Sequence, residues 1–368
     1  MDSLPSADFH GSYLPGDVCF LLKQVSLAPT DVATKERLIQ SGRAHYSTML
    51  SAEHPPGAAY LELFHESLRR NGDRLARDVA ALAHTLARGA GGEVVLASLA
   101  RAGTPVGVLL VRALRAMGIQ STHYSLSIIR DRGIDSVALD HILERHQAAD
   151  VVFVDGWTGK GSIAGELESS IAEYNQTRGT HLTPKMAVVV DLAGVADIAA
   201  TAEDYLIPSS VLNAVVSGLV SRTLLNEELV RPGDFHACVY YADLAPHDLS
   251  RHFVDFLSPL VKGHLAVSSP VDWGAARRAE LRAASANFVS WVGKEFHVAH
   301  RHRIKPGIGE STRALLRRVP DRLLIADPTA QDLLHLVLLA RQKQVPVHHV
   351  PDLPYRATAI IREVRDDA

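Results

Sequence analysis

Short apolar segments alternate with helical segments between residues 93 and 191, and this alternation constrains the fold more than any other feature. Four strands are predicted, at Glu93 to Leu99, Gln120 to Ser127, Ala149 to Val154 and Lys185 to Asp191. Helical stretches follow the first three, at residues 106–117, 136–146 and 163–174. The last two strands are apolar at successive positions, which is typical of strands buried on both faces. Strands that alternate with helices over short connections predict an α/β fold with a mostly parallel sheet and helices on both faces.

The segments on either side of this core predict three further parts. An amphipathic helix from Asp73 to Arg88 opens the core, because Leu75, Val79 and Leu82 recur at helical spacing. From about Pro270 an Ala- and Arg-rich helix leads into a second α/β pattern, with strands at 322–326 and 345–348, a helix at 329–342 and a helical stretch after Pro354. We therefore expect an N-terminal cap (1–72), a main α/β domain (73–268), a helical linker (269–300) and a small C-terminal α/β domain (301–368).

Composition excludes several classes of protein. Hydrophobic residues make up 47% and charged residues 21% of the chain, which is ordinary globular usage and excludes a disordered or fibrous protein. Lys and Arg number 38 against 41 Asp and Glu, so any basic surface must be local. Cys19 and Cys238 lie in no CxxC frame, which excludes a disulfide scaffold and a thiolate zinc site. With neither a secretion signal nor a long apolar stretch, we expect a cytoplasmic protein without membrane contact.

The segment Val151 to Ser162, VVFVDGWTGKGS, predicts a phosphate-binding loop. A buried strand delivers Asp155 to its carboxyl end, and a loop with three glycines then opens a helix whose free N–H groups favour an anion. Thr158 and Ser162 can donate hydroxyl hydrogens, Lys160 can add a charge, and the carboxylate of Asp155 suits the hydroxyls of a ribose. The spacing fits neither a P-loop nor a dinucleotide fingerprint, and a strand-to-helix turn without a ligand is the alternative.

A second loop, Ser98 to Gly107 (SLARAGTPVG), follows another predicted strand. Arg101 beside Gly103 offers a cation and exposed backbone N–H groups, which suit a diphosphate. Because the carboxyl ends of parallel strands meet at one edge of a sheet, we expect both loops at that edge. A simple turn is the alternative for this loop as well.

Together the two loops resemble those of type I phosphoribosyltransferases, which bind 5-phosphoribosyl 1-diphosphate with Mg²⁺. Nearly the whole chain resembles a bacterial family found with tellurium-resistance gene clusters. The resemblance is carried by SGRAHYSTML, SLARAGTPVG, VDGWTGKGSI, EDYLIPSSVLNAVVSGLVSRT, GDFHACVYY and HRIKPGIGESTRALLRR. That family is labelled either phosphoribosyltransferase-like or "cysteine protease StiP", and it carries a C-terminal Pelota-type RNA-binding domain. The resemblance implies a type I phosphoribosyltransferase-like sheet and a Pelota-like C-terminal domain.

The transferase label implies an enzyme site built on both loops. Asp155 would contact ribose, and the 5-phosphate would be held by Thr158, Gly159, Lys160, Gly161 and Ser162. Diphosphate would be held by Arg101, Ala102 and Gly103, with Arg101 and a substrate-bound Mg²⁺ stabilising the leaving group. The substrate would be 5-phosphoribosyl 1-diphosphate or a related phosphosugar or nucleotide, in a stress-associated nucleotide or RNA pathway. Transferases usually carry two adjacent acids, whereas position 156 is glycine, which weakens the expected ribose contact.

The protease label implies a thiol, a base and an orienting group. The candidate set is Cys19 with His45, oriented by Glu53 or Asp17, and an ordinary buried cysteine is the alternative for Cys19. Cys238 is expected in the core. A third hypothesis is a non-catalytic, RNA-associated protein whose loops sense a nucleotide.

A polar stripe is predicted near the middle of the chain. Asn213, Ser217 and Ser221 recur at steps of four in an otherwise apolar stretch, next to Arg222. On a helix they would form either a wall for a second substrate or a face for close packing. Asp191 ends a buried strand, so it either lines the same cleft or caps a helix.

Basic residues gather between Phe296 and Arg322, where seven Lys and Arg stand against two acids. The candidates for phosphate contacts with RNA are Arg303, Lys305, Arg313, Arg317 and Arg318. The alternative is a domain that packs on the core or forms a homodimer. The histidines at 297, 300 and 302 lack the spacing of a metal motif, so we interpret them as part of a basic linker and expect no metal held directly by the protein.

Overall fold

The structure, a computed structural model, describes residues 8–363. Its main domain is built on a six-stranded sheet in which every neighbouring pair of strands is parallel. In spatial order the strands are β1 (Cys19–Leu21), β4 (Ser121–Leu126), β3 (Val94–Leu99), β7 (Val151–Thr158), β8 (Met186–Asp191) and β9 (Ile198–Thr201). The predicted parallel sheet is therefore confirmed.

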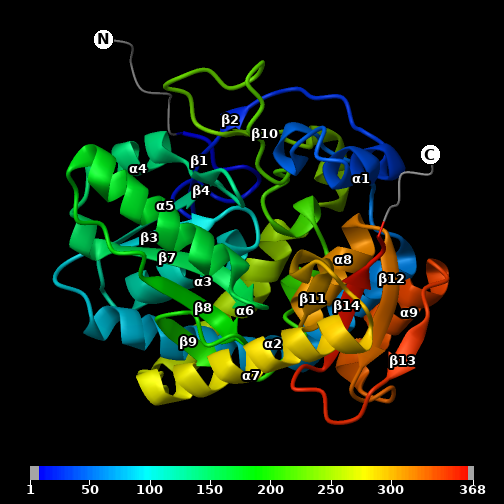
Figure 1. Cartoon of the computed structure of the whole chain (residues 1–368). Helices are drawn as coiled ribbons and strands as arrows, with labels where there is room; N and C mark the ends of the chain where they lie inside the picture. Colours follow the sequence, from blue (N-terminus) through cyan, green and yellow to red (C-terminus); the bar gives the residue numbers. More distant parts are fainter. Residues whose placement is uncertain (1–7, 364–368) are drawn as a thin grey trace.

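Helices cover both faces of this sheet (Figure 1). The helices on one face are α2 (Ala58–Arg88), α3 (Gly103–Ala116) and α6 (Ser250–Leu265). Those on the other are α4 (Ser136–Leu143) and α5 (Ser162–Arg178). Along β3, Leu96 belongs to the first core and Ala97 to the second, because successive side chains of a strand point to opposite faces. No helix within residues 8–363 combines the length and apolarity needed to cross a membrane.

The N-terminal region belongs largely to the main domain. The predicted helix at 73–88 is present, but α2 begins at Ala58, so the expected boundary at residue 72 falls inside one helix. The buried side chains of Phe64 and Leu68 continue the apolar stripe that starts the predicted helix. The region also supplies β1 to the main sheet. Its other elements are β2 (Lys23–Gln24), which pairs with β10 (Ala237–Cys238), and α1 (Val32–Gln40).

The stretch from residue 206 to 222 is not a helix. It contains two short 3-10 turns, Pro208–Val211 and Ala214–Val216, so Asn213, Ser217 and Ser221 do not form the predicted stripe. Gly218 and Leu219 have positive φ angles of 82° and 59°, and such left-handed backbone cannot continue a helix. A small hairpin, β5 (Ile128–Ile129) and β6 (Gly133–Ile134), follows β4.

The C-terminal part has the predicted α/β architecture. The linker helix α7 (Ala275–Glu295) leads to a four-stranded sheet in the order β11 (Ile304–Pro306), β14 (Ala357–Ile361), β12 (Pro320–Ile325) and β13 (Val347–His349). Helices α8 (Ile308–Arg317) and α9 (Leu334–Gln342) complete it. The helical stretch expected after Pro354 is wrong. That segment is β14, which is buried along its whole length because it pairs with β11 on one side and β12 on the other.

Candidate functional site

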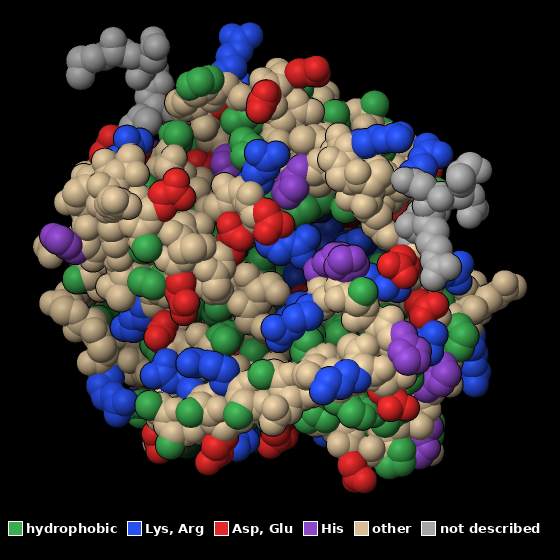
Figure 2. Space-filling model, viewed as in Figure 1, with side chains coloured by type: hydrophobic (Ala, Val, Ile, Leu, Met, Phe, Trp, Pro, Cys, Tyr) green, Lys and Arg blue, Asp and Glu red, His purple; other side chains and the backbone are tan. Residues whose placement is uncertain are grey.

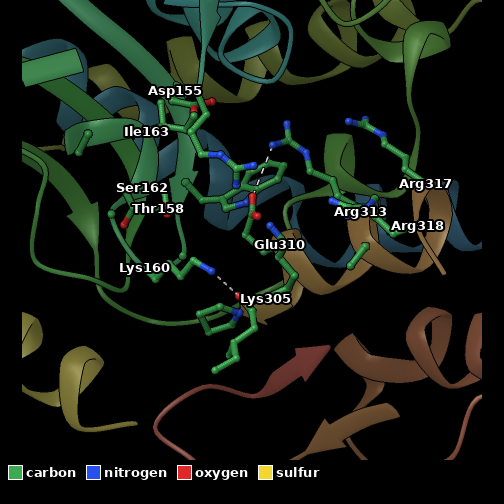
Figure 3. Close-up of a pocket in the computed structure, with 18 of the residues that line it drawn as sticks. Asp155, Thr158, Lys160, Ser162, Ile163, Lys305, Glu310, Arg313, Arg317 and Arg318 are labelled. Atoms are coloured by element: carbon green, nitrogen blue, oxygen red, sulfur yellow. Dashed lines mark hydrogen bonds and ion pairs between the residues drawn. The ribbon is translucent and has the colours of Figure 1, made fainter. Parts of the chain in front are cut away.

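A cleft of about 280 Å³ lies between the main domain and the C-terminal domain, where Figure 2 shows Lys and Arg side chains gathered in a hollow. The end of β7 and the start of α5 face β11 and α8 across it (Figure 3). The cleft brings together two groups of residues that the sequence predicted as separate sites. The phosphate loop contributes Asp155, Thr158, Gly159, Lys160, Gly161 and Ser162, and the basic segment contributes Lys305, Arg313, Arg317 and Arg318.

The predicted phosphate loop is shorter than expected, because β7 continues to Thr158. The Thr158 hydroxyl donates a hydrogen bond to the carboxylate of Asp191, at the end of β8. That carboxylate also accepts the N–H groups of Ala193 at 3.0 Å and Ala196 at 2.8 Å. Thr158 and Asp191 therefore fix the turn after β8 against β7, and Asp191 does not line the cleft.

Two glycines of this loop have different structural roles: Gly159 allows the contact between the domains, and Gly161 begins α5. A Cβ atom on Gly159 would lie 2.8 Å from Cγ of Glu310 and 2.9 Å from the carbonyl oxygen of Pro306, so only glycine allows α8 and β11 to approach this closely. Gly161 has a φ of 83°, a left-handed conformation that glycine adopts without strain, and it caps α5. Ser162, the first residue of α5, is exposed at the mouth of the cleft.

Positive charge dominates the cleft. Its cations are Arg130, Lys160, Lys305, Arg313, Arg317 and Arg318. The carboxylates that line it are Asp155 and Glu310. Arg130 follows β5, and no pattern in the sequence connects it with the basic segment that it faces. Six cations against two carboxylates in a partly enclosed space favour an anionic ligand.

Burial changes the protonation of several of these groups. It lowers the pKa of Lys160 to about 7, with help from the neighbouring charge of Lys305, and it lowers the pKa of Lys305 as well. Burial raises the pKa of Asp155 to about 6, although Arg313 opposes the change. Burial also opposes ionisation of Glu310, but Lys305 and Arg313 outweigh it and lower the pKa of that carboxyl. A bound anion would therefore stabilise the protonated forms of Lys160 and Lys305 most.

The cations of the cleft are held in different ways. Lys160 Nζ donates to the carbonyl oxygens of Arg301 at 2.5 Å and Ile304 at 2.7 Å, which ties the loop to the start of the C-terminal domain. The Arg313 guanidinium lies 4.5 Å from the centre of the Trp157 ring, a cation–π arrangement. The carbonyl groups leave the charge of Lys160 uncompensated, whereas Arg313 also lies 3.6 Å from a carboxylate oxygen of Glu310.

Arg303 is the predicted RNA contact that lies outside the cleft. Its side chain is buried, and its Nε donates to the carbonyl oxygen of Ile361 at 2.9 Å. Its Nη1 lies 3.6 Å from a carboxylate oxygen of Glu363. Arg303 therefore holds the end of β14 and is not free to contact a ligand.

The residues of the predicted diphosphate loop make their contacts within the protein. Arg101 is buried, donates to the carbonyl oxygen of Val220 at 2.7 Å and pairs with Glu53 at 2.5 Å. A Cβ atom on Gly103 would lie 2.2 Å from the carbonyl oxygen of Val154, so this glycine allows α3 to pack on β7. Ala102 directly precedes α3. The expectation that residues 101–103 bind a diphosphate is therefore corrected: these residues stabilise the fold.

The predicted substrate wall also makes internal contacts. Asn213 Oδ1 accepts a hydrogen bond from Arg317 Nε at 2.9 Å, and Ser217 Oγ donates to the carbonyl oxygen of Asn213 at 2.8 Å. Arg222 donates to the carbonyl oxygens of Tyr46 and Met49. These residues lie near a second cavity, behind the cleft.

The structure does not bring Cys19 and His45 together. Cys19 packs against the core under α4 and α5, and the charges that act on its thiol are Asp8 and Arg145. Helix α4 starts near the carboxyl end of β4 and runs back along the sheet, so Arg145 lies toward the amino ends of the strands. His45 lies toward the carboxyl ends of the strands. There its Nδ1 is 2.8 Å from Ser47 Oγ, and the charges of residues 130–132 act on it.

The expected orienting groups are engaged elsewhere. Glu53 pairs with Arg101 and accepts the Ala214 N–H at 3.0 Å. Asp17 pairs with Arg112 at 2.6 Å. The sequence could not reveal these partners, because the positions of residues 17 and 53 in the chain do not determine where in the fold each side chain lies.

A different chain of polar residues begins beside Cys19. In the sheet register Cys19 lies beside Tyr124, whose hydroxyl is 3.0 Å from Nε2 of His146. Nδ1 of the same ring lies 2.8 Å from a carboxylate oxygen of Glu93. Sequence reasoning missed these three residues, and no motif or spacing links them. By contrast, Cys238 is fully buried, as expected.

Comparison with known proteins identifies the families that match the two parts of this chain. A PELOTA RNA binding domain matches residues 283–363, and the family described as "Tellurite-like stress resistance cysteine protease StiP" matches residues 11–258. The protein named "Cysteine protease StiP" from Acinetobacter baylyi is 41% identical over 366 residues, covering 97% of this chain and 95% of its own length. The chain belongs to the StiP family of tellurite-like stress resistance proteases, with a C-terminal Pelota domain. It is thus a member of an enzyme family.

Solved structures resemble only part of the chain. The hypoxanthine phosphoribosyltransferase of Trypanosoma cruzi is 17% identical, with a TM-score of 0.25, over 37% of this chain and 77% of its own. A glutamine mutant from a study of an invariant aspartic acid in such transferases is 15% identical, also with a TM-score of 0.25, over 47% and 90%. Likeness at this level supports no conclusion about activity.

The expectation of a transferase that binds 5-phosphoribosyl 1-diphosphate is wrong. The family and its curated relative are named as cysteine proteases, which agrees with the alternative instead. One feature of the structure agrees with this correction: Arg101, the expected diphosphate contact, is paired internally with Glu53. The expected Mg²⁺ depended on that substrate.

Proposed function

We propose that this chain is a cysteine peptidase with Cys19 as its nucleophile. The observation that carries the assignment is that, of the chain's two cysteines, Cys238 is fully buried whereas Cys19 is only partly buried and lies beside a chain of polar groups. That chain runs from Tyr124 through His146 to Glu93. Membership in the StiP family supports the same activity.

The thiol of Cys19 requires a base. Burial raises its pKa to about 12, with a further contribution from Asp8, so the thiol is protonated at pH 7. We assign His146 as the base, held by Glu93 and reached through the Tyr124 hydroxyl. As Sγ bonds to the peptide carbonyl carbon, the thiol proton passes to His146 and then to the departing amine. Water then hydrolyses the thioester and restores the thiol.

Replacing Cys19 by serine should abolish proteolysis. With fluorescein-labelled casein as the probe, we expect Cys19→Ser to lower the cleavage rate at least about 1000-fold, because a serine hydroxyl in this setting is a far weaker nucleophile. Cys238→Ser is the matched control and should keep wild-type activity in the fraction that folds. His146→Ala should lower the rate by about 100-fold or more. Cleavage that survives Cys19→Ser, or a wild-type protein that does not cleave casein, would contradict the assignment.

A second function, RNA binding in the cleft, is favoured by a separate observation. The cleft lies where the Pelota domain meets the main domain, and six cations with two carboxylates line it. Phosphate contacts supply most of the affinity of such surfaces and make it depend on salt. The Arg313 guanidinium, which covers the buried ring of Trp157, adds a planar cation of the kind on which unpaired bases stack. We propose that single-stranded RNA binds here through its phosphates.

RNA binding should weaken as the pH rises through 7. Because burial lowers the pKa of Lys160 to about 7, this lysine is only half charged there, and a bound phosphate favours its protonated form. Fluorescence anisotropy with a labelled 20-nucleotide RNA should give a several-fold lower affinity at pH 8 than at pH 6. Lys160→Met should reduce that difference to the part contributed by Asp155, which ionises further above pH 6, and Lys305→Met should weaken binding about ten-fold. The exposed Lys262, on α6, provides the control Lys262→Met, and equal losses in Lys262→Met and Lys305→Met would count against this site.

A further inference from the structure

A second, larger cavity lies behind the cleft and has a different character. Its volume is about 440 Å³, within the range of small-molecule sites. Three parts of the chain line it: α1 with the segment 50–57, the segment 211–215 with Arg222, and the ends of α8 and α9. The apolar wall consists of Val32, Ile39, Leu50, Pro55, Pro56, Leu212, Leu244, Leu316 and Leu339. We call this space the amphipathic cavity, because its other side is cationic.

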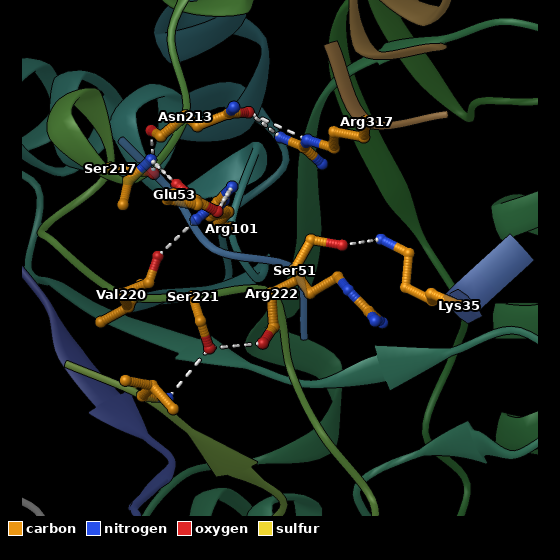
Figure 4. Close-up of polar contacts among 12 residues, drawn as sticks. Lys35, Ser51, Glu53, Arg101, Asn213, Ser217, Val220, Ser221, Arg222 and Arg317 are labelled. Carbon is orange, nitrogen blue, oxygen red and sulfur yellow. Dashed lines mark hydrogen bonds and ion pairs between the residues drawn. The ribbon is translucent and has the colours of Figure 1, made fainter. Parts of the chain in front are cut away.

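The cations of this cavity fall into two groups (Figure 4). Arg101 is paired with Glu53, and Arg318 is paired with Glu36 at 2.9 Å. Each of these two ion pairs is neutral overall, so neither needs a bound anion to balance its charge.

The second group has neutral partners. Lys35 Nζ donates to Ser51 Oγ at 2.5 Å, Arg222 donates to backbone carbonyls, and Arg317 donates to the side-chain oxygen of Asn213. Within residues 8–363 none of these three cations is within 4.0 Å of a carboxylate oxygen. The protein therefore gathers three uncompensated charges on one side of the cavity.

Arg222 shows most directly that an acceptor is missing. Its Nη1 atom is buried and has no hydrogen-bond partner, whereas its Nη2 atom donates twice. Buried donors are almost always paired in proteins. The charges also disturb one another: burial, together with the charge of Arg222, lowers the pKa of Lys35 to about 8. A singly charged oxygen anion between Lys35 and Arg222 would satisfy both groups.

We propose that the amphipathic cavity binds an aliphatic carboxylate, with its oxygens on Lys35 and Arg222 and its chain along the apolar wall. The two oxygens of a carboxylate match a guanidinium donor and an ammonium donor. The leucine, isoleucine, valine and proline side chains of the wall form a continuous apolar contact for a saturated chain, whereas they offer no partner to the hydroxyls of a sugar. This site requires neither the peptidase reaction nor RNA binding.

Calorimetric titration of the full chain with octanoate tests the proposal. We expect saturable binding, about four-fold tighter for each added methylene from hexanoate to decanoate. The neutral analogue octanamide should bind at least ten-fold more weakly. Equal binding of octanoate and octanamide, or tighter binding of octyl phosphate, would overturn the assignment. The carboxylate could belong to a fatty acid or to the end of an apolar peptide, so N-acetyl-leucyl-leucine is titrated in parallel, and the tighter ligand identifies the source.

Variants separate this site from a general effect of charge. Lys35→Met should weaken octanoate binding at least about ten-fold, because it removes the charge but keeps the length of the side chain. Lys35→Arg keeps the charge and should retain most of the affinity for octanoate. It is the variant to measure where Lys35→Met folds poorly. Lys262→Met, on the exposed surface of α6, should bind octanoate as the wild type does. Wild-type affinity in Lys35→Met, or an equal loss in Lys262→Met, would overturn the proposal.

Discussion

Replacing Glu53 by alanine should destabilise the protein by about 3–5 kcal/mol, because it leaves Arg101 as a buried charge without a partner. The Arg101 side chain is only 4% exposed, and the Glu53 carboxylate is the only acid that pairs with it among residues 8–363. The same carboxylate accepts the Ala214 N–H, so the variant also loses a hydrogen bond. Urea denaturation followed by circular dichroism measures the change.

The pH dependence of stability gives an independent readout. Burial opposes ionisation of Glu53, but Arg101 and Arg317 outweigh it and hold the pKa of that carboxyl below its ordinary value of 4.5. A lowered pKa in the folded state adds stability that is present above pH 4.5 and is lost as the pH falls through the lowered value. Glu53→Ala should therefore show a flatter acid limb than the wild type. Glu53→Gln, which keeps the hydrogen bonds, should lose less stability, and a loss as large as that of the alanine variant would argue against shape and hydrogen bonding as contributors.

Replacing Gly103 by alanine should cost about 3 kcal/mol or more, since the added carbon would lie 2.2 Å from the carbonyl oxygen of Val154. The contact is with the backbone of β7, which cannot move aside as a flexible side chain can. The strand would have to shift at the position that carries Asp155, whose Cα lies 3.1 Å from the new atom. Thermal unfolding should therefore begin at a lower temperature, and the cleft should lose its RNA affinity.

A second glycine provides the matched control. Gly165 is also in a helix, α5, and a Cβ atom there would meet nothing within 4 Å. Gly165→Ala should stabilise the protein by about 0.5–1 kcal/mol, because alanine loses less backbone entropy in a helix. Similar stabilities of Gly103→Ala and Gly165→Ala would show that the close approach of α3 to β7 is not maintained in solution.

Much of the fold could be predicted from local pattern. The strands at 94–99, 151–154 and 186–191 are apolar at successive positions because they have a core on each side, and that pattern is visible in the sequence. The basic segment and the glycine loop were also visible. The last strand was not: β14 was predicted as a helix because its pairing partners, β11 and β12, come from distant parts of the chain.

The candidate sites were predicted less well, for a physical reason. Arg101 and Gly103 had the chemistry of a diphosphate loop, but the same cation and the same glycine serve a buried ion pair and a close packing contact. Cys19 and His45 had the chemistry of a dyad but lie at opposite ends of the strands. The residue type determines which interactions a side chain can make, whereas the residues packed against it in the fold determine which of these interactions it makes.

The sequence by itself determined the α/β class, the small second domain and the local excess of positive charge near residue 310, because each depends on residues close together in the chain. Only the tertiary structure decided that this charge faces the glycine loop of the main domain, that a chain of contacts from Tyr124 through His146 to Glu93 begins beside Cys19, and that Lys35 and Arg222 share a cavity. These are contacts between residues far apart in the chain, and the packing of whole elements, rather than any local pattern, sets such distances.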